Sequence, residues 1–134
     1  MKHNILIVCA NYYPEISAEL LNGAKNFLKE SDITFDDYRK INVPGVFEIP
    51  VVIARNIEKY DGVIALGCVI KGKTPHFEFI SQASTDAIMK LSIDYKKPIG
   101  NGIITCLNKK QAISRSKTKG VEAAEAVLRV LKNF

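Results

Sequence analysis

Short apolar runs alternate with segments of helical periodicity along the whole chain, and this alternation constrains the fold more than any other feature. The runs expected to contain strands are Asn4–Ala10, Ile33–Val43, Asp61–Val69 and Pro98–Leu107. Elsewhere apolar residues recur every three or four positions, which predicts helices over residues 15–30, 47–57, 77–93, 109–114 and 119–131. Apolar strands that alternate with helices are typical of a parallel sheet covered on both faces. The sequence therefore predicts an α/β fold of three layers, α/β/α, around a four-stranded parallel sheet.

Length and charge limit the partners that the chain can have. With 134 residues, the chain fits one domain, residues 1–134, that is large enough to bury a hydrophobic core. Its net charge of +5 comes from scattered lysines, whereas a nucleic-acid surface needs clustered basic residues. No apolar run approaches the length of a membrane span, and no signal peptide precedes the first strand. We expect a cytoplasmic protein that binds neither nucleic acid nor membrane.

The three cysteines, Cys9, Cys68 and Cys106, lie in or beside expected strands. Their spacing matches no zinc motif, and an odd number of dispersed cysteines is typical of reduced thiols in a cytosolic protein. We therefore expect no metal site. Cys68 is expected to serve as a small buried apolar residue rather than as a catalytic nucleophile.

The unusual residues of this chain gather in loops that follow the expected strands, where open parallel sheets bind their ligands. The segment Gly67–Phe79, GCVIKGKTPHFEF, joins a strand to a helix and contains two glycines, two lysines, a threonine and a histidine. Backbone N–H groups at a helix start, together with cationic side chains, favour an anionic or phosphorylated ligand. An imidazole at the same place can transfer protons near neutral pH.

Four segments in chain order carry a family resemblance. They are VPGVFEIP at residues 43–50, GCVIKGKTPHFEF at residues 67–79, PIGNGIITCLNKKQAISR at residues 98–115 and TKGVEAAEAVL at residues 118–128. Together they resemble the corresponding segments of the lumazine synthase family, and the resemblance covers nearly the whole chain. It implies a flavodoxin-like α/β/α fold and a single lumazine synthase domain over residues 1–134.

The resemblance also implies an activity. Lumazine synthases are transferases of riboflavin biosynthesis. They condense 5-amino-6-(ribitylamino)uracil with 3,4-dihydroxy-2-butanone 4-phosphate to 6,7-dimethyl-8-ribityllumazine, releasing phosphate and water. Imine formation, phosphate elimination and ring closure are all proton-transfer steps, and the resemblance implies no metal and no redox cofactor. One site must therefore hold a phosphate, a flat pyrimidine and a polyol chain.

By this resemblance His76 is the proton-transfer residue, although a histidine at a helix start could also be satisfied by the backbone. Arg115 matches the phosphate-binding arginine, whose guanidinium can hold two phosphate oxygens. Lys73 and Thr74 match neighbouring phosphate contacts at a helix start. Lys73 stands where the family often has a small or acidic residue, so its ammonium could add to phosphate binding.

The resemblance places the pyrimidine and the ribityl chain against a further set of residues. Glu48 has a second interpretation, as a first-turn acid that is favoured by the helix dipole. Asn101 stands where many relatives have an aromatic residue, so a stacking role is lost there. The residues expected to bind the pyrimidine and the ribityl chain are Tyr12, Val46, Phe47, Glu48, Cys68, Val69, Ile70, Asn101 and Lys119.

Two local departures from the family pattern leave questions open. Asn11-Tyr12-Tyr13 stands where the family has RFN. Tyr12 aligns with the aromatic residue that stacks on the pyrimidine, and Tyr13 is the alternative if the loop is shifted by one residue. Arg115 and Lys119 are four positions apart, fewer than in the family, so the conformation of the loop expected between them is undetermined.

The resemblance implies a homo-oligomer with active sites at the interfaces between subunits. A pentamer is the expected form, and decamers and icosahedral shells are the alternatives. We expect His76 and Arg115 to come from one subunit and Phe47 from its neighbour, or the reverse. An association with riboflavin synthase is a further partnership that the resemblance allows.

Other functions are compatible with such a fold. The nearest alternative is archaeal-type riboflavin synthase, a relative that dismutates two lumazine molecules, and the VPGVFEIP and TPHF segments favour lumazine synthase over it. A non-catalytic protein that binds flavin or ribityl compounds would not need His76 and Arg115. A flavodoxin-like electron carrier or a phosphorelay receiver finds no support, since no acidic pair ends the first strand and no hydroxyl-rich loop follows it.

Overall fold

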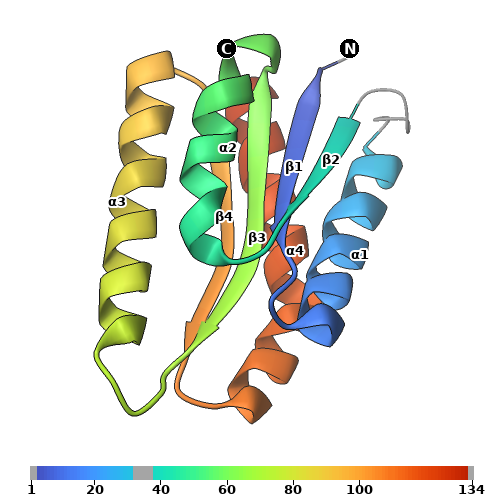
Figure 1. Ribbon diagram of the computed structural model, residues 1–134. Coiled ribbons are helices and arrows are strands. Elements are labelled where there is room, and N and C mark those ends of the chain that lie inside the picture. The colour runs from blue at the N-terminus through green and yellow to red at the C-terminus, as the bar shows by residue number, and fades with distance from the viewer. Residues whose placement is uncertain (1–2, 32–37, 133–134) are drawn as a thin grey trace.

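The computed structural model describes residues 3–31 and 38–132 and forms an α/β fold of three layers (Figure 1). Its strands are β1 (Ile5–Ala10), β2 (Tyr38–Val43), β3 (Gly62–Ile70) and β4 (Ile99–Cys106). Its helices are α1 (Pro14–Glu30), α2 (Ile49–Asn56), α3 (His76–Tyr95) and α4 (Lys109–Lys132), with the short 3-10 helices η2 (Val46–Glu48) and η3 (Ile57–Lys59) on either side of α2. All strands are parallel, in the order β2-β1-β3-β4, which confirms the predicted four-stranded parallel sheet.

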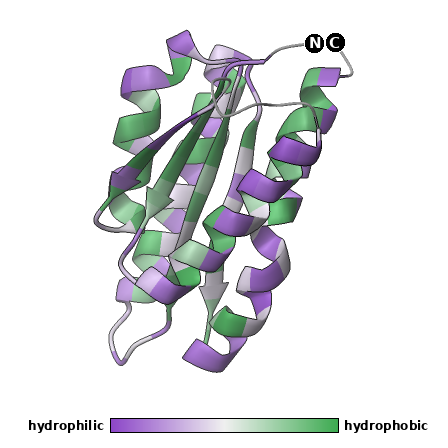
Figure 2. Ribbon diagram, turned by 90° about the vertical axis from the view of Figure 1, so that its right-hand side faces the viewer, coloured by the Kyte–Doolittle hydropathy of each residue, from purple (hydrophilic) through white to green (hydrophobic). Residues whose placement is uncertain are grey.

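The sheet is the middle layer, with α1 and α4 on one face and α2 and α3 on the other (Figure 1). Alternate residues of β1 face opposite layers: Ile5 and Ile7 pack with α1 and α4, whereas Leu6 and Val8 pack with α2 and α3. Every residue of β1 is buried, as expected for a central strand that is covered on both faces. Figure 2 shows the apolar strands between helices with hydrophilic outer surfaces.

The prediction of two C-terminal helices, over residues 109–114 and 119–131, is wrong, because α4 is one continuous helix. The polar residues between them suggest a break, but small residues carry the buried face of the helix through this stretch. Ala112, Ser116 and Gly120 are buried at intervals of four and bring α4 close to α1. The loop expected between Arg115 and Lys119 is therefore helical, and the two residues lie about one turn apart.

Two other element boundaries bear on the predictions. Residues 33–37, where the second strand was expected to start, lie outside the described part of the chain, and β2 begins at Tyr38. The helix expected from residue 47 becomes α-helical at Ile49, after the 3-10 turn η2. Pro50 occupies the first turn of α2, where its missing N–H breaks no helical hydrogen bond. In the described residues, no helix is long and apolar enough to cross a membrane.

All four strands end at the same edge of the sheet, the lower edge in Figure 1. Two backbone hydrogen bonds continue the ladders beyond this edge. The N–H of Asn11 donates to the carbonyl of Val43 at 3.1 Å, and the N–H of Lys71 donates to the carbonyl of Cys106 at 2.9 Å. The loops in which the sequence gathers its unusual residues are thereby fixed at one end of the domain.

Candidate active site

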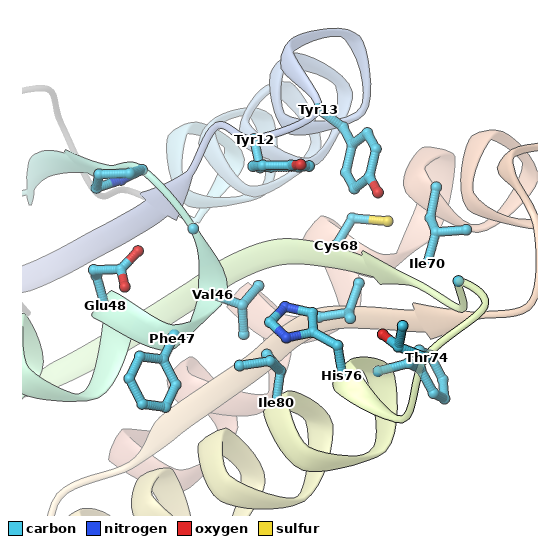
Figure 3. Close-up of a pocket in the computed structure, with 15 residues that line it drawn as sticks. Tyr12, Tyr13, Val46, Phe47, Glu48, Cys68, Ile70, Thr74, His76 and Ile80 are labelled. Atoms are coloured by element: carbon cyan, nitrogen blue, oxygen red, sulfur yellow. The ribbon is translucent and has the colours of Figure 1, made fainter.

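A cavity of about 790 Å³ opens at the carboxyl edge of the sheet. Its walls come from the β1–α1 loop, the β2–α2 loop with η2, the end of β3 and the first turn of α3 (Figure 3). The sequence-predicted site residues that line it are Tyr12, Val46, Phe47, Glu48, Cys68, Val69, Ile70, Thr74 and His76. Segments that are far apart in the chain therefore meet in one cavity.

His76 is the first residue of α3, and its exposed side chain lines the cavity. Figure 3 shows the imidazole pointing into the cavity, near Val46 and Ile80. Within the described residues, no hydrogen bond holds this ring. An imidazole in this position can accept a proton from a bound molecule and return it.

The end of β3 presents an open backbone edge. Its ladder with β1 ends at Leu66, whereas its ladder with β4 continues to Ile70. Residues 67–70 thus lack a paired strand on the β1 side, while the side chains of Cys68 and Val69 are buried. Free N–H and C=O groups along such an edge can hydrogen-bond the edge of an amide-like ring, much as a further strand would.

The turn η2 supplies the opposite wall of the cavity. Phe47 is 63% exposed at the cavity, whereas its neighbour Val46 is buried beneath the turn. Glu48 is half-buried and stands directly before α2, so its carboxylate both lines the cavity and lies at a helix N-terminus. Both interpretations of Glu48 from the sequence fit this position.

The β3–α3 loop brings Thr74 to the cavity, two residues before α3 begins. The first N–H groups of a helix have no partner within it and attract anions. Lys73 is exposed on the same loop but does not line the cavity. Lys71 lies 3.7 Å from the carboxylate of Glu78, and both side chains are about half exposed.

Tyr12 and Tyr13 meet edge to face above the cavity, with ring centroids 5.0 Å apart and an interplanar angle of 79°. Tyr12 is 72% exposed, whereas Tyr13 is half-buried and packs against the core cluster that contains Cys68 and Cys106. Both residues line the cavity. The free ring faces of Tyr12 suit it better to stacking, because the ring of Tyr13 is already held by the core.

Besides Lys73, the predicted site residues Asn101, Arg115 and Lys119 lie outside this cavity. Arg115 and Lys119 line a separate hollow of about 270 Å³ beside β4. The guanidinium of Arg115 donates from Nη1 to the carbonyl of Thr105 at 3.1 Å. Asn101 is exposed on β4, where its Oδ1 accepts a hydrogen bond from the N–H of Ile103 at 3.1 Å.

Comparison with known proteins identifies the family. The model of the family described as 6,7-dimethyl-8-ribityllumazine synthase matches residues 2–134. A protein of that name from Bartonella bacilliformis is 48% identical over 93% of this chain and 86% of its own length. Another, from Agrobacterium fabrum, is 42% identical over 98% of this chain and 94% of its own length. A third, from Renibacterium salmoninarum, is 37% identical over 92% of this chain and 84% of its own length.

This chain belongs to the lumazine synthase family. The resemblance inferred from the four sequence segments is thereby confirmed.

In this lumazine synthase family member, three of the expected site residues are divided between two hollows. Within one chain, His76 lies in the same cavity as Phe47, and Arg115 lies apart from both. Within one chain, the structure therefore does not bring His76 and Arg115 together, and the way in which subunits share the site stays a prediction. The cause of the separation is the topology, because His76 begins a helix on the face covered by α2 and α3, whereas Arg115 belongs to α4 on the other face.

Some residues that line the cavity were not predicted from the sequence to belong to the site. Phe77 and Ile80 on α3 and Gly72 in the loop before it line the cavity. Ile80 lies one helical turn after His76, so the spacing of four positions could have identified it. In the described residues, no group of three or more His, Cys, Asp or Glu side chains could hold a metal ion.

The thiol of Cys68 lies in the wall of this cavity but is poorly suited to nucleophilic chemistry. Burial raises the pKa of Cys68 from its ordinary 9.0 to about 12, and the adjacent thiol of Cys106 contributes to the shift. Burial also raises the pKa of Cys9. Because the thiolate is the reactive form of cysteine, Cys68 in the folded protein is inert near neutral pH.

We expect Cys68→Ala to retain turnover within about threefold, because the family reaction needs no thiol and the smaller residue keeps the backbone edge of β3. Iodoacetamide at pH 9 is expected to leave Cys68 unmodified in the native protein and to alkylate it in urea, where its pKa returns toward 9.0. Peptide mass spectrometry measures the alkylation. Rapid native labelling of Cys68, or loss of turnover in Cys68→Ala without loss of stability, would contradict this expectation.

Proposed function

We propose that this chain condenses 5-amino-6-(ribitylamino)uracil with 3,4-dihydroxy-2-butanone 4-phosphate to 6,7-dimethyl-8-ribityllumazine, as a transferase of riboflavin biosynthesis. The observation that carries the proposal is the cavity at the carboxyl edge of the sheet. It brings a free imidazole, an open backbone edge and a helix N-terminus together in one site. The family membership supports the same reaction.

In this proposal each wall of the cavity has a task. The pyrimidine lies beneath Tyr12 with its amide edge on residues 68–70, and the ribityl hydroxyls lie against Phe47 and Glu48. The phosphate lies near Thr74 and the start of α3, where unpaired N–H groups face an anion. Lys73 adds a positive charge on the exposed side of this loop.

His76 acts on the steps that require proton transfer. It removes a proton as the amine attacks the carbonyl of the butanone, returns it as water leaves, and assists loss of the phosphate and closure of the second ring. Its place at the cavity between the ribityl wall and the phosphate loop supports this role. The decisive assay mixes the purified protein with both substrates and follows lumazine absorbance and phosphate release.

The same assay distinguishes the proposed reaction from that of the nearest alternative, archaeal-type riboflavin synthase. A protein of the archaeal riboflavin synthase type would form riboflavin when supplied with lumazine alone. We expect no riboflavin from lumazine alone and one phosphate released for each lumazine formed from the two substrates. Riboflavin formation without the butanone phosphate would contradict the proposal.

We further propose a homopentamer in which Arg115, Lys119 and Asn101 of one subunit complete the cavity of its neighbour. Their position outside the cavity of their own chain supports this arrangement. So do large apolar side chains that are exposed on and near α3 and β4, because a partner would cover them. These side chains are Phe79, Met89, Ile93 and Leu107.

A mixing experiment tests the shared site. We expect His76→Ala and Arg115→Ala each to lose most of their turnover, and co-expressed mixtures of the two to recover about a quarter of wild-type turnover. With random assembly, a whole site forms only where an intact His76 meets an intact Arg115 across an interface. Mass spectrometry of intact assemblies verifies the mixing and counts the subunits. Mixed assemblies without recovered turnover would contradict the shared site.

The proposal also includes a cellular location and a partner protein. We place the enzyme in the cytoplasm, which the three free, buried cysteines support. Riboflavin synthase would use the product, and co-sedimentation of the two proteins tests whether they associate.

A further inference from the structure

Tyr13 combines a fixed ring with a hydroxyl that points into the cavity. Its backbone immediately precedes α1, and its carbonyl accepts a hydrogen bond from the N–H of Ser17 at 2.9 Å. Its ring packs against the core cluster on one side and edge to face with Tyr12 on the other. The backbone and the ring of Tyr13 are therefore both held in place, and the polar end of the side chain faces the cavity.

The polar end of the Tyr13 side chain has no hydrogen-bond partner in the described part of the chain. Among residues 3–31 and 38–132, no side chain or backbone group hydrogen-bonds the Tyr13 hydroxyl. Figure 3 shows this hydroxyl on the cavity side of the ring, directed toward the end of β3 between Cys68 and Ile70. Tyrosine hydroxyls that are partly buried usually have a hydrogen-bond partner, so this one is available to a ligand.

The surroundings keep this hydroxyl a neutral donor. Burial raises the pKa of Tyr13 above its ordinary 10.0, and the nearby Cys68, Tyr12 and Cys106 raise it further. The phenol thus stays protonated throughout the neutral range. A neutral phenol suits a carbonyl oxygen better than a phosphate, which draws cationic groups and helix N-termini.

We infer that Tyr13 determines specificity for the pyrimidine, its hydroxyl donating a hydrogen bond to a ring carbonyl oxygen of the substrate held beneath Tyr12 against residues 68–70. The identity of the ring rests on the proposed function. The two adjacent tyrosines then have different tasks: Tyr12 covers the face of the ring and Tyr13 reads its edge. Tyr13 departs from the family's RFN pattern, so the resemblance implies no such role for it.

The test is Tyr13→Phe, which removes the hydroxyl and keeps the ring packing. The matched control is Tyr60→Phe, at the opposite end of β3, where the side chain is buried away from the cavity. Steady-state kinetics with each substrate varied in turn gives separate KM values, and calorimetry gives the affinity for the aminouracil alone. Thermal unfolding of each variant is measured in parallel.

For Tyr13→Phe we expect a rise of about tenfold in KM and Kd for the aminouracil. The KM for the butanone phosphate, kcat and the melting temperature stay within error of wild type, and Tyr60→Phe leaves both KM values unchanged. An unchanged KM for the aminouracil, or an equal rise in both KM values, overturns the inference. Wild-type protein that neither binds the aminouracil nor forms lumazine overturns the proposed function, and this inference with it.

Discussion

His76→Ala is expected to lower the turnover of lumazine formation by roughly a hundredfold, the lower end of what a positioned proton-transfer group contributes. The imidazole lies at the cavity and no described residue holds it, so its removal takes away the acid and base without disturbing a structural network. Substrate affinity should change little, because neither proposed binding wall depends on this side chain. Pre-steady-state absorbance separates the chemical step from binding.

Glu78→Ala is the matched control for this variant. Glu78 belongs to the same first turn of α3 but does not line the cavity, and its exposed ion pair with Lys71 contributes little to stability. We expect its turnover to stay within about twofold of wild type. Both variants should unfold at the same denaturant concentration as wild type. Unchanged turnover in His76→Ala would remove this residue from the proton-transfer steps.

Much of the fold could be predicted because the central strands β1 and β3 are buried on both faces. β1 and β3 are continuous apolar runs in the sequence, and the helices that cover them show clear periodicity. The failure at α4 has a physical cause. Ser116 and Gly120 are buried there, but a serine and a glycine among lysines look like a break, since only tertiary contact with α1 makes small residues favourable at these positions.

The site could be predicted residue by residue but not as a spatial arrangement. The motif around His76 and the turn at Phe47 are local, and topology brings both to the carboxyl edge of the sheet. The position of Arg115 depends instead on which face of the sheet α4 covers and on how the helix is rotated about its axis. Neither follows from the spacing of the motif. The structure therefore assigns His76 and Arg115 to different hollows of one chain.

Gly120→Ala is expected to lower the free energy of unfolding by about 2 kcal/mol. A Cβ at this position would overlap the carbonyl oxygen of Leu20 and lie 2.9 Å from its carbonyl carbon and 3.2 Å from the N of Ala24. All of these are backbone atoms of α1, which a rotamer change cannot move. The two helices would have to separate, and the core cluster between them would lose contacts.

Helix propensity opposes this effect, since alanine is favoured over glycine in a helix interior by about 1 kcal/mol. The change in stability of Gly120→Ala therefore shows whether helix propensity or packing against α1 dominates at this position. Gly72→Ala is the matched control, because a Cβ there meets no atom within 4 Å. Urea unfolding of all variants at the same chain concentration, so that the concentration dependence of any assembly is the same for each, should show a lower midpoint for Gly120→Ala alone. A midpoint at or above that of wild type would mean that α1 and α4 can move apart at Gly120 without loss of stability. The continuity of α4 would then depend on helix propensity rather than on contact with α1.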